Sequence, residues 1–236
     1  MVKKKITAII LAAGKGSRMN TSVAKQYLLL RDKPVLYYSL KAFEDSDVDE
    51  IILVTGREQK EYCMDKIVKP YHLSKVTQIV EGGKERYDSV YQALLQIQHT
   101  DYVLIHDGAR PFITVNIIND LITQVMQHNA CILATPVKET IKVVDSNGYI
   151  ITTPDRNTLW AAQTPQAFDY EMIKKAYTIF YKHRNDNEAA VTDDAMVYGD
   201  YLGKPVKIIH GDYRNIKITT LEDLAIADAI LNELLF

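Results

Sequence analysis

The sequence predicts an α/β fold in which a mostly parallel sheet is flanked by helices on both faces and carries a protruding β-hairpin arm. The first observation is that short β-branched runs, apolar throughout, alternate along the chain with amphipathic stretches of helical period. Strands that are apolar on both faces are typical of parallel sheets covered by helices on both sides. The second observation is an Asn-Gly pair between two β-rich runs, which is among the strongest short-range signals for a hairpin.

The first predicted strand, "ITAIIL", follows a basic start but is too short for the core of a signal peptide or for a membrane span. The predicted strands are residues 6–11, 51–55, 76–80, 102–106 and 130–137. The amphipathic stretches between them, which we predict to be helices, are residues 35–43, 61–68, 86–97 and 115–128. Because ligands bind beyond the carboxyl ends of the strands in such sheets, the loops that follow these strands should converge. The four loops in question begin after Leu11, Val80, Ile105 and Val137.

Residues 139–168 break this alternation. The runs "IKVV" and "YIITT" flank "DSNG", which predicts a two-stranded arm at about residues 139–160. An isolated hairpin is marginally stable in water, so an arm with several large apolar residues needs a partner. Two arrangements remain open: an extra antiparallel edge on the main sheet, or an arm that crosses to a neighbouring subunit. The tail, residues 215–236, is predicted to form a short strand and a terminal helix capped by Thr219 or Thr220.

Composition and charge describe an ordinary globular protein of 236 residues, 47% of them hydrophobic, which is enough to fill a core. We expect one domain over residues 1–236, because no repeat, linker or low-complexity segment divides the chain. The net charge of −2 offers no general attraction to nucleic acid or to an anionic membrane, so any anion site must be local. Cys63 and Cys131 belong to no CxxC or Cys/His cluster. We therefore expect a reduced, cytoplasmic protein without structural zinc.

A glycine-containing loop with three cations, Lys15, Arg18 and Lys25, directly follows the first strand. The dinucleotide fingerprint GxGxxG fails there, because Met19 stands where the third glycine is needed for close helix packing. The Walker A pattern is also absent. Small residues let a ligand lie against the backbone, whose N–H groups can hold phosphate oxygens, while Arg18 and Lys25 add full charges. The loop is therefore predicted to hold phosphates; the alternative is a solvated turn that happens to be basic.

Together, "LAAGKGSRM" and "AKQY" resemble the signature of nucleotidyltransferases that join a nucleoside triphosphate to a phosphorylated sugar or polyol. Further blocks look like those of the 2-C-methyl-D-erythritol 4-phosphate cytidylyltransferase family, in the same order: "EGGKERYDSV", "HDGARPF", "TPVKETIK", "PDRNTLW", "QTPQAF", "VTDDA" and "NIKITTLEDL". The resemblance spans residues 7–229 and implies a single Rossmann-like nucleotidyltransferase domain. Sister enzymes that activate D-ribitol 5-phosphate for teichoic acid share most blocks. Three loops, "AAG", "GGKERYDS" and "LWAAQ", favour the methylerythritol phosphate family.

The resemblance implies that a phosphate oxygen of 2-C-methyl-D-erythritol 4-phosphate attacks the α-phosphorus of CTP and that pyrophosphate leaves. The product would be 4-diphosphocytidyl-2-C-methyl-D-erythritol, an intermediate of isoprenoid precursor biosynthesis. A phosphate monoester is largely ionised at neutral pH, so the attacking oxygen needs no general base. Positioning and charge neutralisation should dominate, with Mg²⁺ as the expected cofactor. Two other classes are less favoured: a non-catalytic nucleotide-binding regulator would have lost Arg18 or Lys25, and a dinucleotide-dependent oxidoreductase needs the missing glycine.

The resemblance also implies roles for individual residues. The catalytic residues are Arg18, Lys25 and Lys217. The nucleotide-binding residues are Ala12, Ala13, Gly14, Gly16, Gly82, Gly83, Ser89 and Asp107, of which Gly82, Gly83 and Ser89 belong to the segment that reads cytosine. The residues that hold the second substrate are Arg110, Thr140, Arg156 and Thr164, together with Lys217. Lys84 departs from the family pattern, which often has an acidic or polar residue there, so we expect the base to be contacted by the backbone of this loop.

The expected cofactor and partners also follow from the resemblance. Asp107 comes directly after a buried strand and is the candidate metal ligand, in direct or indirect contact with a Mg²⁺ ion that the triphosphate mainly holds. In the family the hairpin arm hooks over the neighbouring subunit, so Thr140 and Arg156 would complete the partner's site in a homodimer. The implied partners are CTP, a polyol phosphate and a second copy of the chain, with neither nucleic acid nor membrane.

Other polar residues in these blocks are predicted to have structural roles. His106 is accompanied by no cysteine, serine or metal ligand at a suitable spacing, so we expect it to be packed or hydrogen-bonded. Asp193 and Asp194 look acidic enough for a metal, but we interpret them as a helix start whose carboxylates complement the helix dipole. Arg86 is interpreted as structural.

Overall fold

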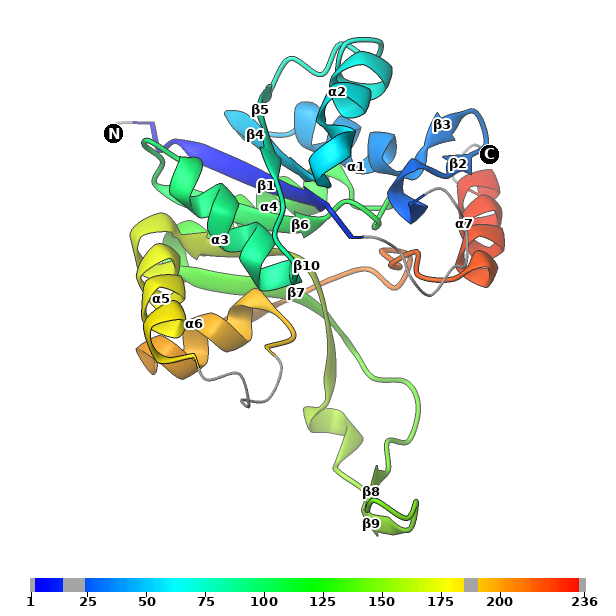
Figure 1. The fold of residues 1–236 in the computed structure, drawn as a ribbon. Helices are drawn as coiled ribbons and strands as arrows, with labels where there is room; N and C mark the ends of the chain where they lie inside the picture. Colours follow the sequence, from blue (N-terminus) through cyan, green and yellow to red (C-terminus); the bar gives the residue numbers. More distant parts are fainter. Residues whose placement is uncertain (1–2, 15–23, 185–190, 234–236) are drawn as a thin grey trace.

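The computed structural model of the chain describes residues 3–14, 24–184 and 191–233. Its centre is a seven-stranded sheet in the order β11-β7-β10-β6-β1-β4-β5, in which β10 runs antiparallel to both neighbours and the other pairs are parallel (Figure 1). The strands are β1 (Ile6–Ala12), β4 (Glu50–Thr55), β5 (Val76–Glu81), β6 (Tyr102–Asp107), β7 (Ala130–Pro136), β10 (Trp160–Asp169) and β11 (Lys207–His210). This arrangement confirms the predicted α/β class and the mostly parallel sheet.

Helices cover both faces of the sheet, as the alternating pattern predicted. The helices α1, α2 and α4 share a core with one face, whereas α3, α5 and α6 share a second core with the other face. The helices are α1 (Val35–Glu44), α2 (Lys60–Cys63, continued by a π-helix over Met64–Val68), α3 (Arg86–Gln96), α4 (Val115–His128), α5 (Tyr170–His183), α6 (Asp194–Leu202) and α7 (Leu221–Glu233). Within the described ranges, no helix is both long enough and apolar enough to cross a membrane.

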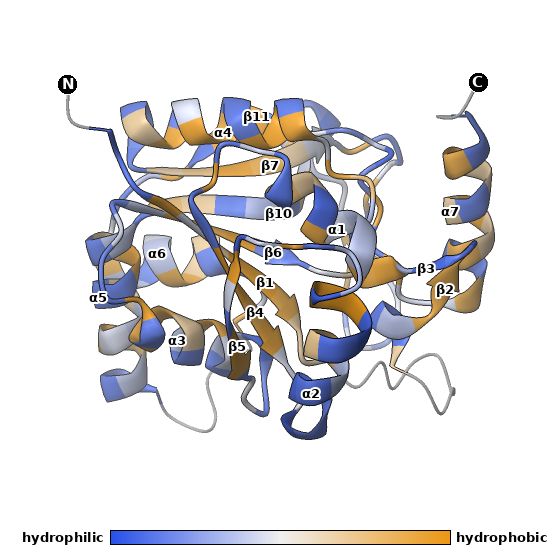
Figure 2. Cartoon of the chain, turned by 90° about the horizontal axis from the view of Figure 1, so that it is seen from above, coloured by the Kyte–Doolittle hydropathy of each residue, from blue (hydrophilic) through white to orange (hydrophobic). Residues whose placement is uncertain are grey.

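The central strand β1 shows why the sheet is covered on both sides. Ile6, Ala8 and Ile10 lie in the core shared with α1 and α4, whereas Ile9 lies in the core shared with α3 and α5. Successive side chains of a strand point to opposite faces, so a strand that is apolar throughout is buried on both. Each buried isoleucine stabilises the fold by about 1.5–3 kcal/mol. Figure 2 shows β1 and β4 as hydrophobic along most of their length.

The strand β10 lies inside the sheet, between β6 and β7, although the sequence pattern assigned no sheet strand to this part of the chain. Two adjacent residues of β10, Ala167 and Phe168, are fully buried, one in each of the two opposite cores. The chain enters β10 on its return from the hairpin arm, so the strand runs back through the sheet antiparallel to β7. The irregular segment after residue 139 thus combines an arm with a central strand.

The hairpin arm forms as predicted. Its strands β8 (Val143–Val144) and β9 (Ile150–Thr152) pair antiparallel in a separate two-stranded sheet, which projects from the body of the molecule (Figure 1). The carboxylate of Asp145 closes the turn by accepting hydrogen bonds from two backbone N–H groups, one of them from Tyr149 at 2.9 Å. Gly148 has a backbone φ of +85°, an angle that residues other than glycine rarely adopt. The alternative of an extra edge on the main sheet is therefore not realised by these strands.

The prediction for the C-terminal segment is only half right. The helix α7 begins after Thr220, whose hydroxyl accepts a hydrogen bond from the N–H of Asp223 at 3.4 Å, while the carboxylate of Asp223 accepts one from the N–H of Thr220 at 2.9 Å. No strand forms over residues 215–219, where the sequence predicted one; the edge strand is β11. Ile218 instead packs with α7 and a small hairpin. That hairpin consists of β2 (Leu29–Leu30) and β3 (Lys33–Pro34).

Both cysteines are buried as free thiols in the core beneath α1, α2 and α4. Burial raises the pKa of Cys63, and it raises the pKa of Cys131 to about 12. The two residues therefore behave as small hydrophobic side chains. Among the described residues, no group of three or more His, Cys, Asp or Glu side chains is placed to hold a metal ion.

Candidate active site

The loops that follow β1, β5 and β6 meet at the carboxyl edge of the sheet and border a pocket of about 510 Å³. The predicted site residues that line it are Ala12, Ala13, Gly14, Lys25, Gly83, Ser89, Asp107 and Lys217. These three loops thus converge as expected, whereas the segment after β7 leads into the arm and does not line the pocket. Gly16 and Arg18 lie outside the described residues.

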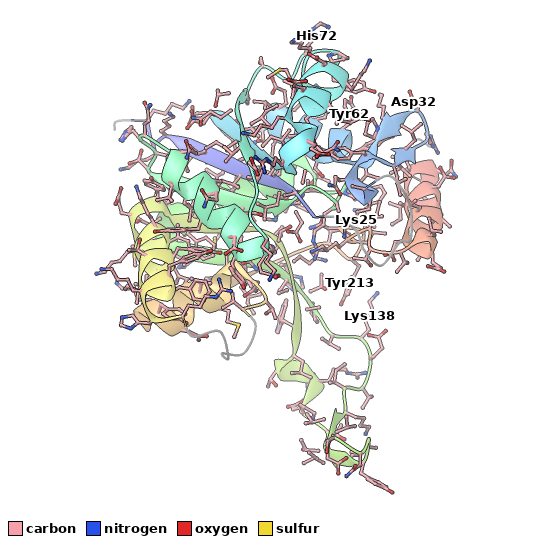
Figure 3. The ribbon with its side chains drawn as sticks, in the orientation of Figure 1. Lys25, Asp32, Tyr62, His72, Lys138 and Tyr213 are labelled. Atoms are coloured by element: carbon pink, nitrogen blue, oxygen red, sulfur yellow. The ribbon has the colours of Figure 1, made fainter. Side chains whose placement is uncertain are left out.

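Gln26 shapes the first loop, a role that the sequence motifs did not reveal. Its buried side-chain amide donates hydrogen bonds to the carbonyl oxygens of Ala12 at 2.6 Å and Gly14 at 3.1 Å. Lys25, labelled in Figure 3, directly precedes it in a 3-10 helix. The amide of Gln26 therefore anchors the turn that carries the lysine, which lines the pocket. A single amide ahead of the apolar run "YLLL" was the available signal for a buried hydrogen-bonding role.

The second loop is packed so closely that both of its glycines are required. A Cβ atom on Gly82 would lie 2.4 Å from the Cβ of Ala13, and one on Gly83 would lie 2.2 Å from the Cβ of Asp88. Gly82 does not itself line the pocket; it packs against Ala13 and Ser89 instead. The hydroxyl of Ser89 accepts a hydrogen bond from the N–H of Gly83 at 3.1 Å and fixes the loop to α3. The first residues of α3 also border the pocket, and a helix N-terminus favours a bound phosphate.

Asp107 ends β6 at the base of the pocket and contacts two cations. Its carboxylate accepts a hydrogen bond from Nε of Arg86 at 3.1 Å and lies 2.6 Å from Nζ of Lys217. Burial alone would raise the pKa of Asp107, but the neighbouring Arg86 and Lys217 hold that pKa well below its usual range. Asp107 is therefore ionised at neutral pH and joins two segments that are far apart in the sequence.

A second group of hydrogen bonds holds the backbone beside Asp107. The N–H of Asp107 donates to the hydroxyl of Thr164 at 3.0 Å, and that hydroxyl lies 3.1 Å from Nδ1 of His106. The other ring nitrogen, Nε2, lies 3.3 Å from the carbonyl of Arg110, which can only accept, so Nε2 carries the proton. Burial lowers the pKa of His106 to about 3, and the ring is neutral. The prediction that His106 is a packed, hydrogen-bonded histidine is confirmed.

Two residues with predicted substrate contacts, Thr164 and Arg110, lie just behind the pocket. Thr164 is buried, and its carbonyl accepts a hydrogen bond from the side chain of Asn215 at 2.9 Å. Nη1 of Arg110 donates to the carbonyl of Asn215 at 2.6 Å, whereas its buried Nε has no acceptor among the described residues. Neither side chain lines the pocket, so their contacts with a substrate remain predictions.

The acidic segment "VTDDA" is a helix start, as interpreted from the sequence. Asp193 caps α6, because its carboxylate accepts a hydrogen bond from the N–H of Met196 at 2.9 Å. Asp194 is fully buried and forms an ion pair with Arg86, with 2.8 Å between Nη2 and Oδ2. Arg86 thus has the structural contacts expected of it, but it also lines the pocket.

Thr140 and Arg156 belong to the segment between β7 and β10, which projects from the body of the molecule as the arm (Figure 1), and neither residue lines the pocket of its own chain. Both are exposed, and Nη1 of Arg156 donates a hydrogen bond to the carbonyl of Lys138 at 3.0 Å. The ammonium of Lys138 in turn lies 3.7 Å from the ring centre of Tyr213, at the base of the arm (Figure 3). A single chain therefore does not bring Thr140 and Arg156 to the site.

The described lining of the pocket includes two lysines with predicted roles, Lys25 and Lys217, but no histidine or cysteine. The carboxylate of Glu85, which also lines the pocket, caps α3 and leaves Asp107 as the candidate metal ligand. One carboxylate cannot hold Mg²⁺ alone, but Mg²⁺ usually keeps several waters and binds phosphate oxygens beside one or two carboxylates. The residues present therefore fit a Mg²⁺ ion that is held mainly by a triphosphate.

These features define a class of protein. A pocket at the carboxyl edge of a mostly parallel sheet, lined by small residues after the first strand and by lysines, is typical of α/β enzymes that transfer phosphate-containing groups. A family model described as 2-C-methyl-D-erythritol 4-phosphate cytidylyltransferase (IspD) matches residues 6–233, and the chain belongs to this family. The protein is thus a nucleotidyltransferase, which confirms the resemblance seen in the sequence.

Individual relatives agree with the family match. A 2-C-methyl-D-erythritol 4-phosphate cytidylyltransferase of Lachnoclostridium phytofermentans is 51% identical over 230 residues, which cover 98% of this chain and 97% of the relative. The protein of the same name from Lachnospira eligens is 53% identical over 226 residues, with 95% and 98% covered. Among solved structures, the 4-diphosphocytidyl-2C-methyl-D-erythritol synthase of Anaerococcus prevotii has a TM-score of 0.83 and 32% identity, with 97% and 96% covered. The cytidylyltransferase of Francisella tularensis has a TM-score of 0.78 and 32% identity, with 95% and 99% covered.

Proposed function

We propose that the enzyme transfers the cytidylyl group of CTP to 2-C-methyl-D-erythritol 4-phosphate, giving 4-diphosphocytidyl-2-C-methyl-D-erythritol and pyrophosphate. The observation that carries this proposal is family membership over residues 6–233, with relatives of that name at 51% and 53% identity. The relatives and structures named above all carry the methylerythritol name, so no observation favours the ribitol 5-phosphate alternative. The product would serve isoprenoid precursor biosynthesis.

The proposed mechanism depends on positioning and charge neutralisation. An oxygen of the attacking phosphate forms a bond to the α-phosphorus, and the bond from that phosphorus to the leaving pyrophosphate breaks. The attacking phosphate is already ionised at neutral pH, so no side chain has to remove a proton. Lys25 and Lys217 line the pocket and would contact phosphate oxygens, and Arg18, outside the described residues, would add a third charge. Mg²⁺, when bound beside Asp107, would neutralise further charge on the phosphates.

The backbone of the first two loops would hold the nucleotide. Ala12, Ala13 and Gly14 line the pocket with side chains no larger than a methyl group, so phosphate oxygens can approach their N–H groups. Gly83, fixed by the hydroxyl of Ser89, would read the cytosine through its backbone. Such a backbone contact does not depend on the neighbouring lysine that departs from the family pattern.

The second substrate would bind between this pocket and the arm of a neighbouring subunit. Thr140 and Arg156 are proposed to bind substrate, yet neither of them lines the pocket of its own chain. The tip of the arm exposes 74% of Tyr149, 62% of Ile150 and 65% of Ile151, which supports burial against a second copy. The enzyme would then be a homodimer in which each arm completes the partner's site.

We expect the enzyme to act in the cytoplasm. Cys63 and Cys131 are free thiols, which suits a reducing compartment. The net charge of −2 supports small phosphorylated substrates rather than nucleic acid or a membrane surface as partners.

Pyrophosphate release tests this proposal. The enzyme would be assayed with CTP and Mg²⁺ in parallel reactions that contain 2-C-methyl-D-erythritol 4-phosphate or D-ribitol 5-phosphate, and then with ATP, GTP and UTP. We expect release with methylerythritol phosphate and CTP, and loss of release when EDTA removes the metal. Release only with ribitol phosphate would contradict the proposed substrate but not the reaction class. No release with either acceptor would contradict the proposed function.

A further inference from the structure

A line of polar and charged groups runs from the core beneath α5 and α6 to the pocket. The hydroxyl of Tyr177 donates a hydrogen bond to Oδ1 of Asp194 at 2.6 Å. Nη1 and Nη2 of Arg86 donate to the two carboxylate oxygens of Asp194 at 3.0 and 2.8 Å. Nε of Arg86 donates to Oδ1 of Asp107 at 3.1 Å, and Nζ of Lys217 lies 2.6 Å from Oδ2 of the same carboxylate. The line therefore alternates in charge and ends at an ammonium group in the pocket.

We propose that Arg86 is a positioning residue that fixes the carboxylate of Asp107, which in turn holds the ammonium of Lys217 at the pocket. The inference rests on the proposed function, because it takes Lys217 to be a cation that acts on phosphate. The guanidinium suits this role through its shape, since it is a planar fork whose donors can bind two carboxylates at once. A lysine at this position would present a single ammonium and could not reproduce that geometry.

The far end of the line is rigidly held. Asp194 is fully buried at the start of α6, and its N–H donates a hydrogen bond to Oε1 of Gln166 at 3.0 Å. Nε2 of Gln166 donates to the carboxylate of Asp193 at 2.9 Å, which ties the helix start to β10. Burial alone would lower the pKa of Arg86, but the neighbouring Asp194 and Asp107 hold that pKa well above its usual range. The guanidinium is thus charged and cannot turn away from Asp107 without leaving Asp194.

The line contains two cations and two carboxylates, and a useful test variant must keep this balance of charge. Arg86 and Lys217 offset Asp107 and Asp194, so removal of Arg86 alone would leave a fully buried carboxylate without its cation. Loss of a buried partner is strongly destabilising, and a loss of activity in that variant would be ambiguous. The double variant Arg86→Met/Asp194→Asn removes one charge of each sign and keeps the backbone of α3 and α6. This double variant therefore separates an effect on folding from an effect on the position of Lys217.

We expect Arg86→Met alone to lower the thermal midpoint by about 10 °C, and the double variant to return to within about 3 °C of the wild type. The double variant should still lose about 10- to 100-fold in kcat for pyrophosphate release, because Asp107 and Lys217 are no longer fixed. Its KM for CTP should stay within about threefold, since Lys25 and the loop backbones are unchanged. A matched control is Asp65→Asn/Lys69→Met, which removes an exposed ion pair of 2.7 Å and should alter neither quantity.

A stable double variant with wild-type kcat would overturn the proposal and leave Arg86 with a purely structural role. The crystal structure of the double variant gives a second readout that needs no substrate. Unchanged positions of Asp107 and Lys217 would also overturn the proposal, even if the wild-type enzyme released no pyrophosphate and the proposed function had failed. If the double variant does not fold, the variant Arg86→Lys tests the positioning role instead. It should fold and show the same loss of kcat, and full activity would contradict the positioning role.

Discussion

Lys25 lies at the pocket in a turn that the amide of Gln26 anchors to the first loop. We expect Lys25→Ala to leave folding intact and to lower kcat by about two to three orders of magnitude. The physical reason is that a charge beside the phosphates stabilises the transition state more than the bound substrates. Steady-state pyrophosphate release measures the loss of activity, and thermal unfolding shows whether the fold is retained.

A lysine in a surface ion pair provides the control for this experiment. Lys69 contacts Asp65 at 2.7 Å, and both side chains are mostly exposed. Lys69→Ala should change the free energy of unfolding by less than about 1 kcal/mol and leave kcat unaltered. Near-normal turnover in Lys25→Ala, with this control also normal, would remove Lys25 from the mechanism.

His106 makes a prediction about stability rather than catalysis. Burial lowers its pKa to about 3 from an ordinary value of 6.5. Between these two values the unfolded chain binds a proton at this residue that the folded chain does not bind. The free energy of unfolding should therefore fall as the pH is lowered through this window, by about 1.4 kcal/mol per pH unit from His106 alone.

Urea unfolding at several pH values between about 7.5 and 5 measures this slope. We expect His106→Gln to flatten it, whereas His128→Gln, at an exposed position of α4, should retain it. Asp107 acts in the same direction, because its folded pKa is depressed, but only as the pH approaches its ordinary value of 3.8. It does not contribute in this window. An unchanged slope in His106→Gln would show that the buried ring does not control the acid sensitivity.

At the scale of elements, the sequence predicted the strands and turns that depend on local burial and local backbone geometry. The strand β1 and the hairpin turn at Gly148 could be predicted, because they depend on alternating burial and on one backbone angle. The strand β10 could not, since its place between β6 and β7 depends on how the chain returns from the arm. The β-branched run at residues 215–219 resembled a strand, but Asn215 is instead held by side-chain contacts to Thr164 and Arg110.

The cap of α7 is an element whose stability can be tested. The carboxylate of Asp223 accepts hydrogen bonds from the N–H groups of Thr219 at 2.7 Å and Thr220 at 2.9 Å. We expect Asp223→Ala to destabilise the protein by about 1–2 kcal/mol and to speed amide exchange along α7. Asp228→Ala serves as the control, because the mostly exposed carboxylate of Asp228 lies in the same helix and its contact with Nε of Arg31 is long, at 3.5 Å. Equal effects of the two substitutions would show that the cap does not stabilise the helix.

At the scale of the whole molecule, the sequence indicated which loops meet but not how their side chains join them. The convergence of three loops follows from the parallel sheet, so residues such as Gly83 and Asp107 could be placed together. The contact between Arg86 and Asp194 spans 108 positions and depends on how α6 packs beside α3. The buried amide of Gln26 is a similar case. Contacts of this kind arise from tertiary packing and leave no periodic signal in the sequence.

The arm leads to a prediction about the dimer, namely that variants of two different subunits can complement each other. Lys25 and Lys217 line the pocket of their own chain, whereas Arg156 begins the short 3-10 helix Arg156–Thr158 of the arm and does not line it. If the arm completes the partner's site, a dimer of one Lys25→Ala subunit and one Arg156→Ala subunit has one site with both defects and one intact site. Co-expression of the two variants, each inactive alone, should therefore recover about a quarter of wild-type activity, because half of randomly paired dimers are mixed.

A second mixture controls for recovery that does not involve the arm. Lys25→Ala and Lys217→Ala affect the same pocket of one chain, so each pocket of their mixed dimer lacks one lysine and no activity should return. Recovery with Arg156→Ala, but not with Lys217→Ala, requires that the arm and the pocket of an active site come from different chains. If each arm served its own chain, both pockets of the first mixed dimer would keep one defect. The absence of recovery would then contradict the composite site, even if the enzyme proved to be a dimer.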